Sequence, residues 1–175
     1  PSTSQTLSIC AVINFALKAG KRAMPNWESD LRMGAKGERV LMQAFNMTKS
    51  NDLKWDLNTR FNKKLELKTD RQAHKTGNFA IEQFSDKDKK SIGGIDRSIR
   101  DKVDIFAVLV WEERKVYFWK VKELKEAVDK AKVEFISETR NEKDGREWVT
   151  TNYIIKRQEL QGSCFKIETI DKKYF

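Results

Sequence analysis

The sequence has 175 residues, enough for one compact domain with an apolar core and too few for two domains of ordinary size. Apolar residues make up 39% of the chain, so burial can offset chain entropy although 35% of the residues are charged, which excludes a disordered protein. Lysine and arginine outnumber aspartate and glutamate by 35 to 26, and the net charge of +9 favours a polyanionic partner, with nucleic acid first. A basic protein without such a partner is the alternative, because net charge does not say where the charge lies.

The cysteines and the first apolar segment indicate the compartment. Cys10 and Cys164 lie far apart in apolar stretches and belong to no cluster with histidine, so we expect free, buried thiols in a reducing environment. The apolar run "LSICAVINFALKAG" is about half the length of a membrane span and follows no basic segment typical of a secretory signal. We therefore expect a cytoplasmic protein with no membrane partner, in the host cell if it is virus-encoded.

In chain order, apolar spacing first predicts two helices and then a series of strands. The helices cover residues 4–18 and 34–45, and residues 53–69 alternate with period two, as in a β-hairpin. Residues 78–85 predict a third strand, and the charged segment 85–102 around Gly93-Gly94 predicts a mobile loop with one helical turn.

The second half of the chain predicts four more strands and one helix. The strands are "VDIFAVLVWEE", "VYFWKV", "VEFISE" and "EWVTTNYIIKR", the last two joined by the turn "TRNEKDGR", and the helix is "KELKEAVDKAK". This order predicts a single mixed α/β domain over residues 1–175, with a central mixed β-sheet flanked by helices.

The hairpin contains the stretch "KWDLNTRFNKKLELKTD", in which acidic and apolar residues separate by face. Because side chains alternate along a strand, Glu66 and Lys68 share one face while Leu65 and Leu67 share the other. An acid two residues before a lysine also occurs elsewhere, for example at 88–90, 113–115, 123–125 and 171–173, and these four copies lie in predicted loops, turns, a helix or the tail. A solvated charged hairpin is the alternative interpretation.

A hairpin centred near Phe61 places Asp56 directly opposite Glu66. Opposed residues have Cβ atoms roughly 5 Å apart, close enough for two carboxylates to share one divalent cation. Like charges opposed across strands are destabilising, and Mg²⁺ or Mn²⁺ would compensate them and still accept a phosphate oxygen. Lys68 would point at the same place, where its ammonium could orient or activate the attacking water and stabilise charge on a phosphodiester.

Asp56 followed by Glu66-Leu67-Lys68 resembles the PD-(D/E)xK nuclease superfamily, which pairs an Asp on one strand with Glu-x-Lys on the next. The resemblance covers roughly residues 34–120 and implies a restriction-endonuclease-like core over about 34–132, to which the N-terminal helix and the C-terminal strands are additions. The sequence departs from the motif at Trp55, because the motif has Pro at this position, although the position varies within the superfamily. It is most similar to phage or mobile-element members and to Holliday-junction-resolvase-type enzymes.

The resemblance also implies a ligand set. Asp56 and Glu66 would bind Mg²⁺ or Mn²⁺, and the Leu67 backbone carbonyl would join them. A helix ahead of the hairpin often supplies another acid, for which the sequence offers Glu38. The alternative for Glu38 is a first-turn acid favoured by the helix dipole.

Further polar residues could support this site. Glu82 or Gln83 would touch it if their strand neighbours Glu66, and are otherwise ordinary edge-strand residues. Basic residues around the Gly-Gly pair could hold phosphates or form a solvated charge run, namely Lys87, Lys89, Lys90, Arg97 and Arg100.

The expected function is Mg²⁺-dependent endonucleolytic cleavage of DNA, selective for structures such as junctions. The alternatives are a non-catalytic nucleic-acid-binding domain of the same fold and a small interaction protein whose charged hairpin is only a surface. A homodimer would suit paired incisions, although the sequence has no coiled-coil seam.

Overall fold

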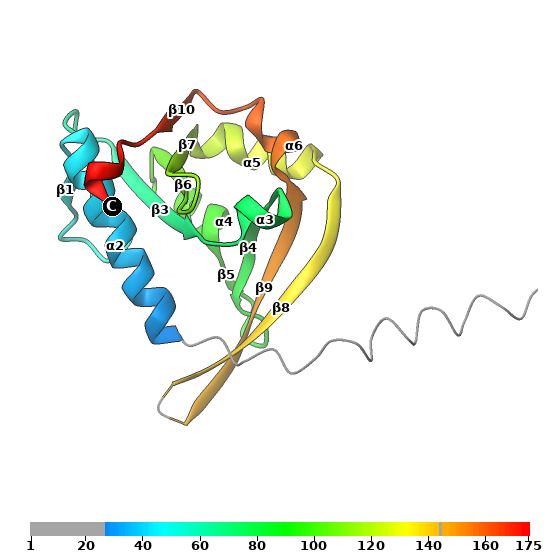
Figure 1. Ribbon diagram of the computed structural model, residues 1–175. Helices are drawn as coiled ribbons and strands as arrows, with labels where there is room; N and C mark the ends of the chain where they lie inside the picture. Colours follow the sequence, from blue (N-terminus) through cyan, green and yellow to red (C-terminus); the bar gives the residue numbers. More distant parts are fainter. Residues whose placement is uncertain (1–26, 144) are drawn as a thin grey trace, which may run out of the picture.

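The computed structural model describes residues 27–143 and 145–175, which form two β-sheets with helices packed against them (Figure 1). The helix expected over residues 4–18 lies outside the described residues. The mixed α/β class and a mixed β-sheet with helices against it are confirmed, and a second, four-stranded sheet that the sequence does not predict accompanies that sheet.

The larger sheet contains the predicted hairpin and the most apolar strand. Its strands run in the order β1 (Thr48–Lys49), β2 (Leu57–Asn58), β3 (Lys64–Asp70), β6 (Ile105–Val110), β7 (Lys115–Lys120) and β10 (Lys166–Thr169). β3 pairs with β6 in parallel, and all other neighbours are antiparallel. Because parallel neighbours need a crossover connection, the chain between β3 and β6 has to leave the sheet and return.

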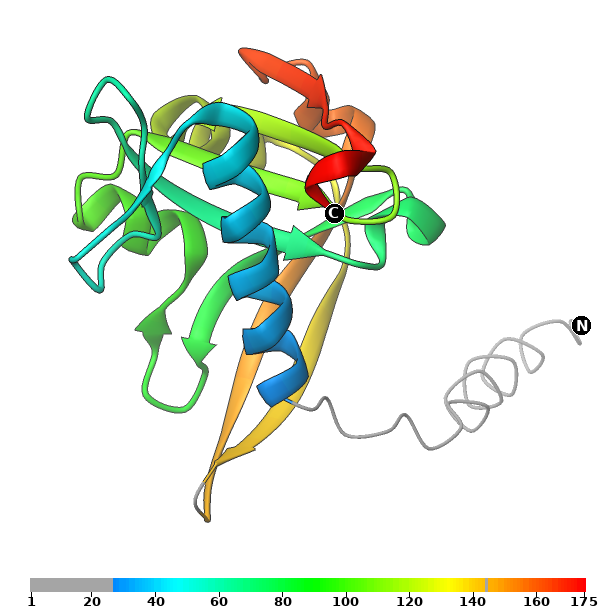
Figure 2. The same ribbon diagram turned by 60° about the vertical axis from the view of Figure 1, so that its left-hand side comes forward.

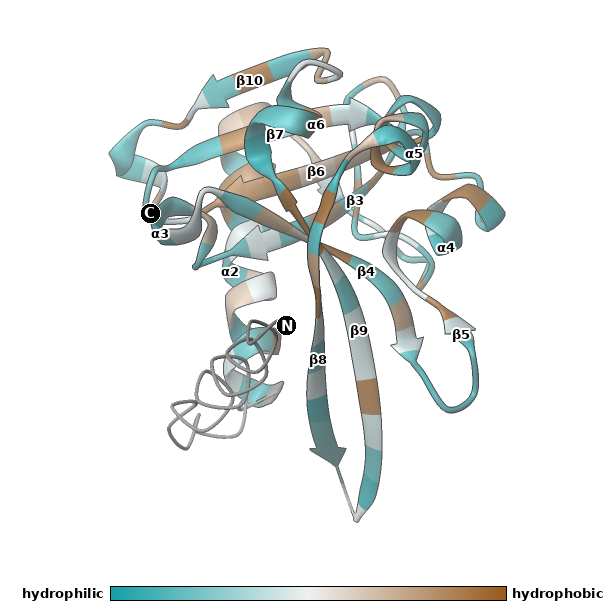
Figure 3. Cartoon of the chain, turned by 90° about the vertical axis from the view of Figure 1, so that its right-hand side faces the viewer, coloured by the Kyte–Doolittle hydropathy of each residue, from teal (hydrophilic) through white to brown (hydrophobic). Residues whose placement is uncertain are grey.

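The smaller sheet is entirely antiparallel, in the order β5 (Ser91–Ile92), β4 (Asn78–Asp86), β9 (Arg146–Lys156) and β8 (Val133–Lys143). The predicted third strand is β4, but it pairs with β9 and not with the motif hairpin. β8 continues through residues 139–143, which the sequence predicts as a turn, so that β8 and β9 form a long arm projecting from the body (Figure 2). The outer half of β8 is hydrophilic, in contrast to the apolar β6 (Figure 3).

Six helices accompany the two sheets in the described part of the chain. They are α2 (Trp27–Phe45), α3 (Ala73–Thr76), α4 (Gly94–Arg100), α5 (Val121–Lys130), α6 (Arg157–Gln161) and the 3₁₀ helix η1 (Lys172–Tyr174). Within residues 27–143 and 145–175, no helix has both the length and the apolar character needed to cross a membrane.

Two apolar clusters cover the two faces of the larger sheet. On one face, Val40 and Leu41 of α2 pack against Leu65 and Leu67 of β3. On the other face, β6 and β7 pack against α4, α5 and the smaller sheet, with Trp119 fully buried. Each fully buried leucine contributes roughly 1.5–3 kcal/mol through burial, so α2 is held firmly against the leucine face of β3.

Two helices differ from their expected bounds. α2 begins at Trp27, well before residue 34, and carries Glu28 and Asp30 in its first turn, where acids interact favourably with the helix dipole. The segment expected to be a mobile loop contains β5 and α4, and Ile95 and Ser98 of α4 are buried. The segment is therefore ordered by packing that its local composition does not reveal.

Cys164 is a free thiol, as expected, and Cys10 lies outside the described residues. Cys164 is half-buried against the apolar cluster between the sheets. Burial raises the pKa of its thiol to about 12, so the group stays protonated at neutral pH.

Candidate active site

Asp56 is bound to β3 by both its main chain and its carboxylate. β2 pairs with β3 so that Leu57 lies opposite Leu65, which is the register of a hairpin centred near Phe61, and Asp56 directly precedes β2, outside the paired residues. The N–H of Asp56 donates to the Leu65 carbonyl at 3.0 Å, and Asp56 Oδ2 accepts a 2.7 Å hydrogen bond from the N–H of Leu67. The carboxylate of Asp56 is thus held against the Glu-x-Lys segment.

Burial separates the two faces of β3 as the alternation predicts. Leu65 and Leu67 are buried beneath α2, and Glu66 and Lys68 point the other way. Glu66 is only 4% exposed, whereas the side chain of Lys68 is 37% exposed, so this face is buried at Glu66 and open at Lys68. A buried carboxylate of this kind requires compensating charge or hydrogen bonds.

Two cations compensate Glu66 through the same oxygen. Lys68 Nζ lies 3.1 Å and Arg97 Nη2 lies 2.9 Å from Glu66 Oε1. Lys68 comes from the same strand, whereas Arg97 comes from α4 in the crossover between β3 and β6.

The electrostatics of Asp56 reflect crowding of negative charge. Burial raises the pKa of its carboxyl above the ordinary value, and the nearby charge of Glu66 raises it further. The hydrogen bond from Leu67 and the charge of Lys68 act in the opposite direction but do not outweigh these effects. An additional cation beside Asp56 would therefore favour the ionised form of its carboxyl group.

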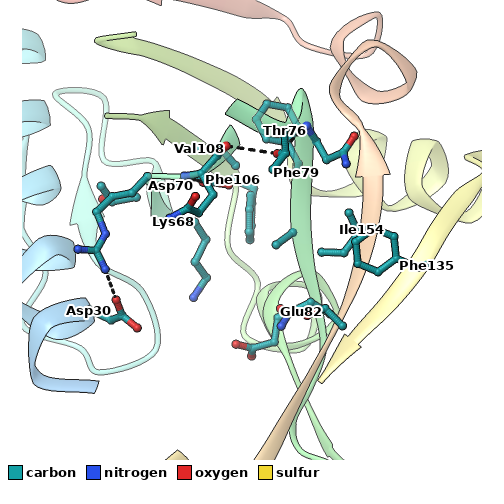
Figure 4. Close-up of a pocket in the computed structure, with 17 residues that line it drawn as sticks. Asp30, Lys68, Asp70, Thr76, Phe79, Glu82, Phe106, Val108, Phe135 and Ile154 are labelled. Atoms are coloured by element: carbon teal, nitrogen blue, oxygen red, sulfur yellow. Dashed lines mark hydrogen bonds and ion pairs between the residues drawn. The ribbon is translucent and has the colours of Figure 1, made fainter. Parts of the chain in front are cut away.

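Lys68 lies between two carboxylates and is a stable ammonium. Burial would lower the pKa of Lys68, but the charges of Glu66 and Glu82 outweigh it and hold that pKa above its ordinary value. Figure 4 shows the Lys68 side chain extending into a groove into which Glu82 also points. At neutral pH Lys68 therefore acts as a positive charge and not as a proton acceptor.

The start of α4 is pressed against Glu82. The N–H of Gly94 donates to Glu82 Oε1 at 3.1 Å, and a Cβ atom on Gly93 would lie 2.6 Å from the same carboxylate oxygen. The glycine pair therefore lets the helix approach Glu82 closely. This contact, together with the ion pair of Arg97 to Glu66, joins α4 to both β4 and β3.

The two predicted supporting residues have different positions. The condition that their strand neighbours β3 is wrong, because β4 belongs to the other sheet. Glu82 nevertheless faces Lys68 across the groove between the sheets. Gln83 lies at an irregularity in the pairing of β4 with β9 and faces α4 and α5, away from the groove.

Glu38 lies near Asp56 but is not bonded to it. α2 approaches β3 so closely at Gly37 that a Cβ atom there would lie 2.0 Å from Thr69 Oγ1. Glu38 forms an ion pair with Lys49, and its charge adds slightly to the raised pKa of Asp56. The alternative of a first-turn acid is wrong, because α2 begins at Trp27 and Glu38 lies well inside it.

The five predicted phosphate-binding residues do not form one patch. Lys87 forms an ion pair with Glu138, and Lys89 lies 3.8 Å from Asp86, both near the turn after β4. Lys90 is exposed there, whereas Arg100 bonds Asp101 at 2.8 and 3.0 Å. Arg97 faces inward to Glu66 and is thus part of the acidic site.

A groove of about 710 Å³ runs between the two sheets, with Lys68 and Glu82 on opposite sides of it (Figure 4). Its first side comes from β3 and the start of α2, where Arg71 and Asp30 form an ion pair at 2.6 Å. Its second side comes from β4, β8 and β9. The volume is within the range of pockets that bind small organic groups.

The donor atoms fit a small divalent cation that keeps several waters. Within residues 27–143 and 145–175, no three Asp, Glu, His or Cys side chains come together as a metal cluster. Asp56 and Glu66 supply two carboxylates, and Leu67 directs its carbonyl to the side of Asp56, because N–H and C=O of one strand residue point the same way. One or two carboxylates with waters are typical of Mg²⁺ sites.

Sequence reasoning missed two contributions to this site. It placed Arg97 among the phosphate-binding residues and not beside Glu66, and no local pattern signals an ion pair that spans a crossover. It also assigned no role to the inward residues of β8 and β9, such as Phe135 and Asn152, which line the groove. The available signal was the alternation of side chains along these two strands, which places Phe135 and Asn152 on one face of the sheet.

Comparison of the sequence with protein-family models gives no match, and no curated protein matches it at a significant level.

Proposed function

We propose that the chain is a metal-dependent nuclease that hydrolyses phosphodiester bonds in DNA. The observation that carries the proposal is the position of Asp56, whose carboxylate is bound to the N–H of Leu67, the residue next to the buried Glu66. Lys68 adjoins this pair at the wall of a groove. The net charge of +9 supports a polyanionic substrate.

Asp56, Glu66 and the carbonyl of Leu67 would hold Mg²⁺ or Mn²⁺, which supplies Lewis acidity and an activated water when bound. Lys68 provides a fixed positive charge, which stabilises the charge that develops on the phosphodiester. Arg97 balances the negative charge of the buried Glu66 through an ion pair.

The proposal includes a restriction-endonuclease-like core. Its support is the order of α2 with Glu38, then Asp56 next to β2, then Glu-x-Lys on β3. In its most detailed form, the proposal is that the nuclease cuts within DNA strands and selects its substrate by DNA structure.

Cleavage of supercoiled plasmid, linear duplex and a four-way junction in Mg²⁺ tests the proposal. Asp56→Asn and Lys68→Met should lower the cleavage rate by at least about a hundredfold, because each removes charge from the reacting centre. The matched control is Asp88→Asn, which alters the exposed acid of another acid-x-Lys triplet and should leave the rate unchanged. Cleavage that persists in Asp56→Asn would refute the site.

One observation favours a second function, that of a non-catalytic nucleic-acid-binding domain. Glu66 already has two cationic partners and can be satisfied without a metal. Calorimetric titration with Mg²⁺ separates the two functions. Salt-sensitive DNA binding without Mg²⁺ binding or cleavage would support the second.

A further inference from the structure

The two sides of the groove differ in chemistry. The side formed by β3 and the start of α2 carries Lys68, Arg71 and Asp30, all of them charged. The side formed by β8 and β9 carries uncharged residues, with Phe135 on β8 and Asn152 on β9. A nucleotide has the same division, since its phosphate is charged and its base is uncharged, aromatic and rich in hydrogen-bonding groups.

The side formed by the smaller sheet is organised in two rows, which run from β4 across β9 to β8. In the first row, Ala80 of β4 lies opposite Ile154 of β9, which lies opposite Phe135 of β8. This row is apolar and ends in an aromatic ring that is 57% exposed. Within the described part of the chain, Phe135 makes none of the ring contacts that other aromatic residues make. It is therefore available as a stacking surface.

The second row is polar and begins at the catalytic end of the groove. Glu82 lies opposite Asn152, which lies opposite Ser137. No side-chain hydrogen bond of Asn152 or Ser137 to another described residue occurs in the structure, whereas the amide of Asn141 is bonded to Thr139 and Thr150. An amide carries both donors and an acceptor and can pair with the edge of a base.

We propose that this side of the groove binds the base of an unpaired nucleotide in the DNA substrate. The base stacks on Phe135 and the edge of that base bonds to Asn152, while its backbone lies on the side of Lys68. A base within a continuous duplex is stacked between its neighbours and cannot enter, so the preferred substrate contains an unpaired or splayed nucleotide near the bond that is cut. The part of this inference that concerns the bond cut rests on the proposed nuclease function. The part that concerns base binding rests only on the residues that line the groove.

Binding to two DNA duplexes that differ by one extra unpaired adenine tests the inference, measured by fluorescence anisotropy without divalent metal. The wild-type protein should bind the bulged duplex more tightly than the paired one. Phe135→Ala should reduce that preference by about tenfold, the magnitude expected for loss of one base–aromatic stack. Asn152→Ala should alter the order of preference among bulged A, C, G and T.

The chain offers a matched control for the aromatic residue. Ile136 is the next residue of β8 and is 56% exposed, but it faces the opposite side of the sheet and lies opposite Tyr153. Ile136→Ala should retain the preference for the bulge. Both substitutions are at exposed positions, and circular dichroism establishes that each variant is folded.

The outcomes separate this inference from the nuclease proposal. Equal binding of bulged and paired duplexes, or equal effects of Phe135→Ala and Ile136→Ala, would overturn the inference even if cleavage requires Asp56. A bulge preference that depends on Phe135, in a protein that cuts neither duplex in Mg²⁺, would uphold base binding and refute the nuclease.

Discussion

The N–H of Leu67 donates a 2.7 Å hydrogen bond to Asp56 Oδ2, which fixes an acid from outside the ladder onto the central residue of Glu-x-Lys. The bond also aligns the carbonyl of Leu67 with the same side of β3. Two carboxylates and a carbonyl thus come from a segment of the chain that is short in sequence and rigid in structure. This rigidity is what a site for a small cation requires, because Mg²⁺ tolerates little deviation in geometry.

Asp56→Asn is predicted to raise the melting temperature at neutral pH. The pKa of Asp56 in the folded protein is above the unfolded value of 3.8, so its ionised form is disfavoured on folding. Below pH 3.8 the group is protonated in both states and costs nothing. The cost grows as the pH rises through the folded pKa, and the variant avoids it. Thermal melts of both proteins from pH 3 to 8 should show that the melting temperature of Asp56→Asn exceeds that of the wild type by an amount that grows with pH. A constant difference across that range would contradict the prediction.

Mg²⁺ is predicted to stabilise the wild-type protein and not the variants that lack a ligand. A metal that binds only the folded state raises stability according to its concentration relative to its dissociation constant, by about 2.7 kcal/mol at a hundredfold excess. The melting temperature of the wild type should rise with added Mg²⁺ and fall back when EDTA is added. Asp56→Asn and Glu66→Gln should show neither change, and Asp88→Asn should behave as the wild type.

The register of the motif could be predicted because local pattern determines it. Leu57 and Leu65 both have to be buried, and this requirement together with the length of the turn leaves one pairing. The position of Asp56 next to the Glu-x-Lys segment follows from that pairing, because Asp56 directly precedes Leu57. The same alternation predicts that Glu66 and Lys68 share a face.

Contacts made by the crossover could not be predicted in this way. The Gly93-Gly94 pair reads as a loop because glycine disfavours helices, yet in the structure it begins α4 where only a small residue fits beside Glu82. The ion pair of Arg97 with Glu66 depends on that helix. The pairing of β4 with β9 likewise joins distant segments, which periodicity cannot match to one another.

Lys68→Met and Lys68→Arg are predicted to show whether the positive charge of residue 68 is required, because Met removes that charge and Arg retains it. The pKa of Lys68 in the folded protein is raised above 10.5, so its contribution to stability is present below that pH and is lost as the pH rises through the folded pKa. Lys68→Met should abolish cleavage and lower stability, because the buried Glu66 then keeps only Arg97. Lys68→Arg should retain more cleavage activity and more stability than Lys68→Met, because it keeps the positive charge.

The pH profile of cleavage checks the role of Lys68. If Lys68 stays an ammonium when Mg²⁺ is bound, it should cause no loss of activity between pH 6 and 10. A rise in rate over that range that disappears in Lys68→Arg would indicate a proton acceptor and contradict the assignment.

Two glycines in α2 are predicted to respond oppositely to the same substitution. A Cβ atom on Gly37 would lie 2.0 Å from Thr69 Oγ1, whereas one on Gly34 would meet nothing within 4 Å. Gly37→Ala should therefore cost about 1–3 kcal/mol by overpacking. Gly34→Ala should stabilise the protein by up to about 1 kcal/mol, because alanine is the better helix former.

Chemical denaturation of these variants measures both effects, and Thr69 supplies the decisive control. Thr69→Ala removes the hydroxyl that the new methyl group would contact, so the double variant Gly37→Ala/Thr69→Ala should be more stable than the sum of the single changes predicts. Additive effects would mean that Gly37 is required for some reason other than its approach to β3. Since Glu38 follows Gly37 directly, Gly37→Ala should also slow DNA cleavage if Glu38 contributes to the site, whereas Gly34→Ala should not.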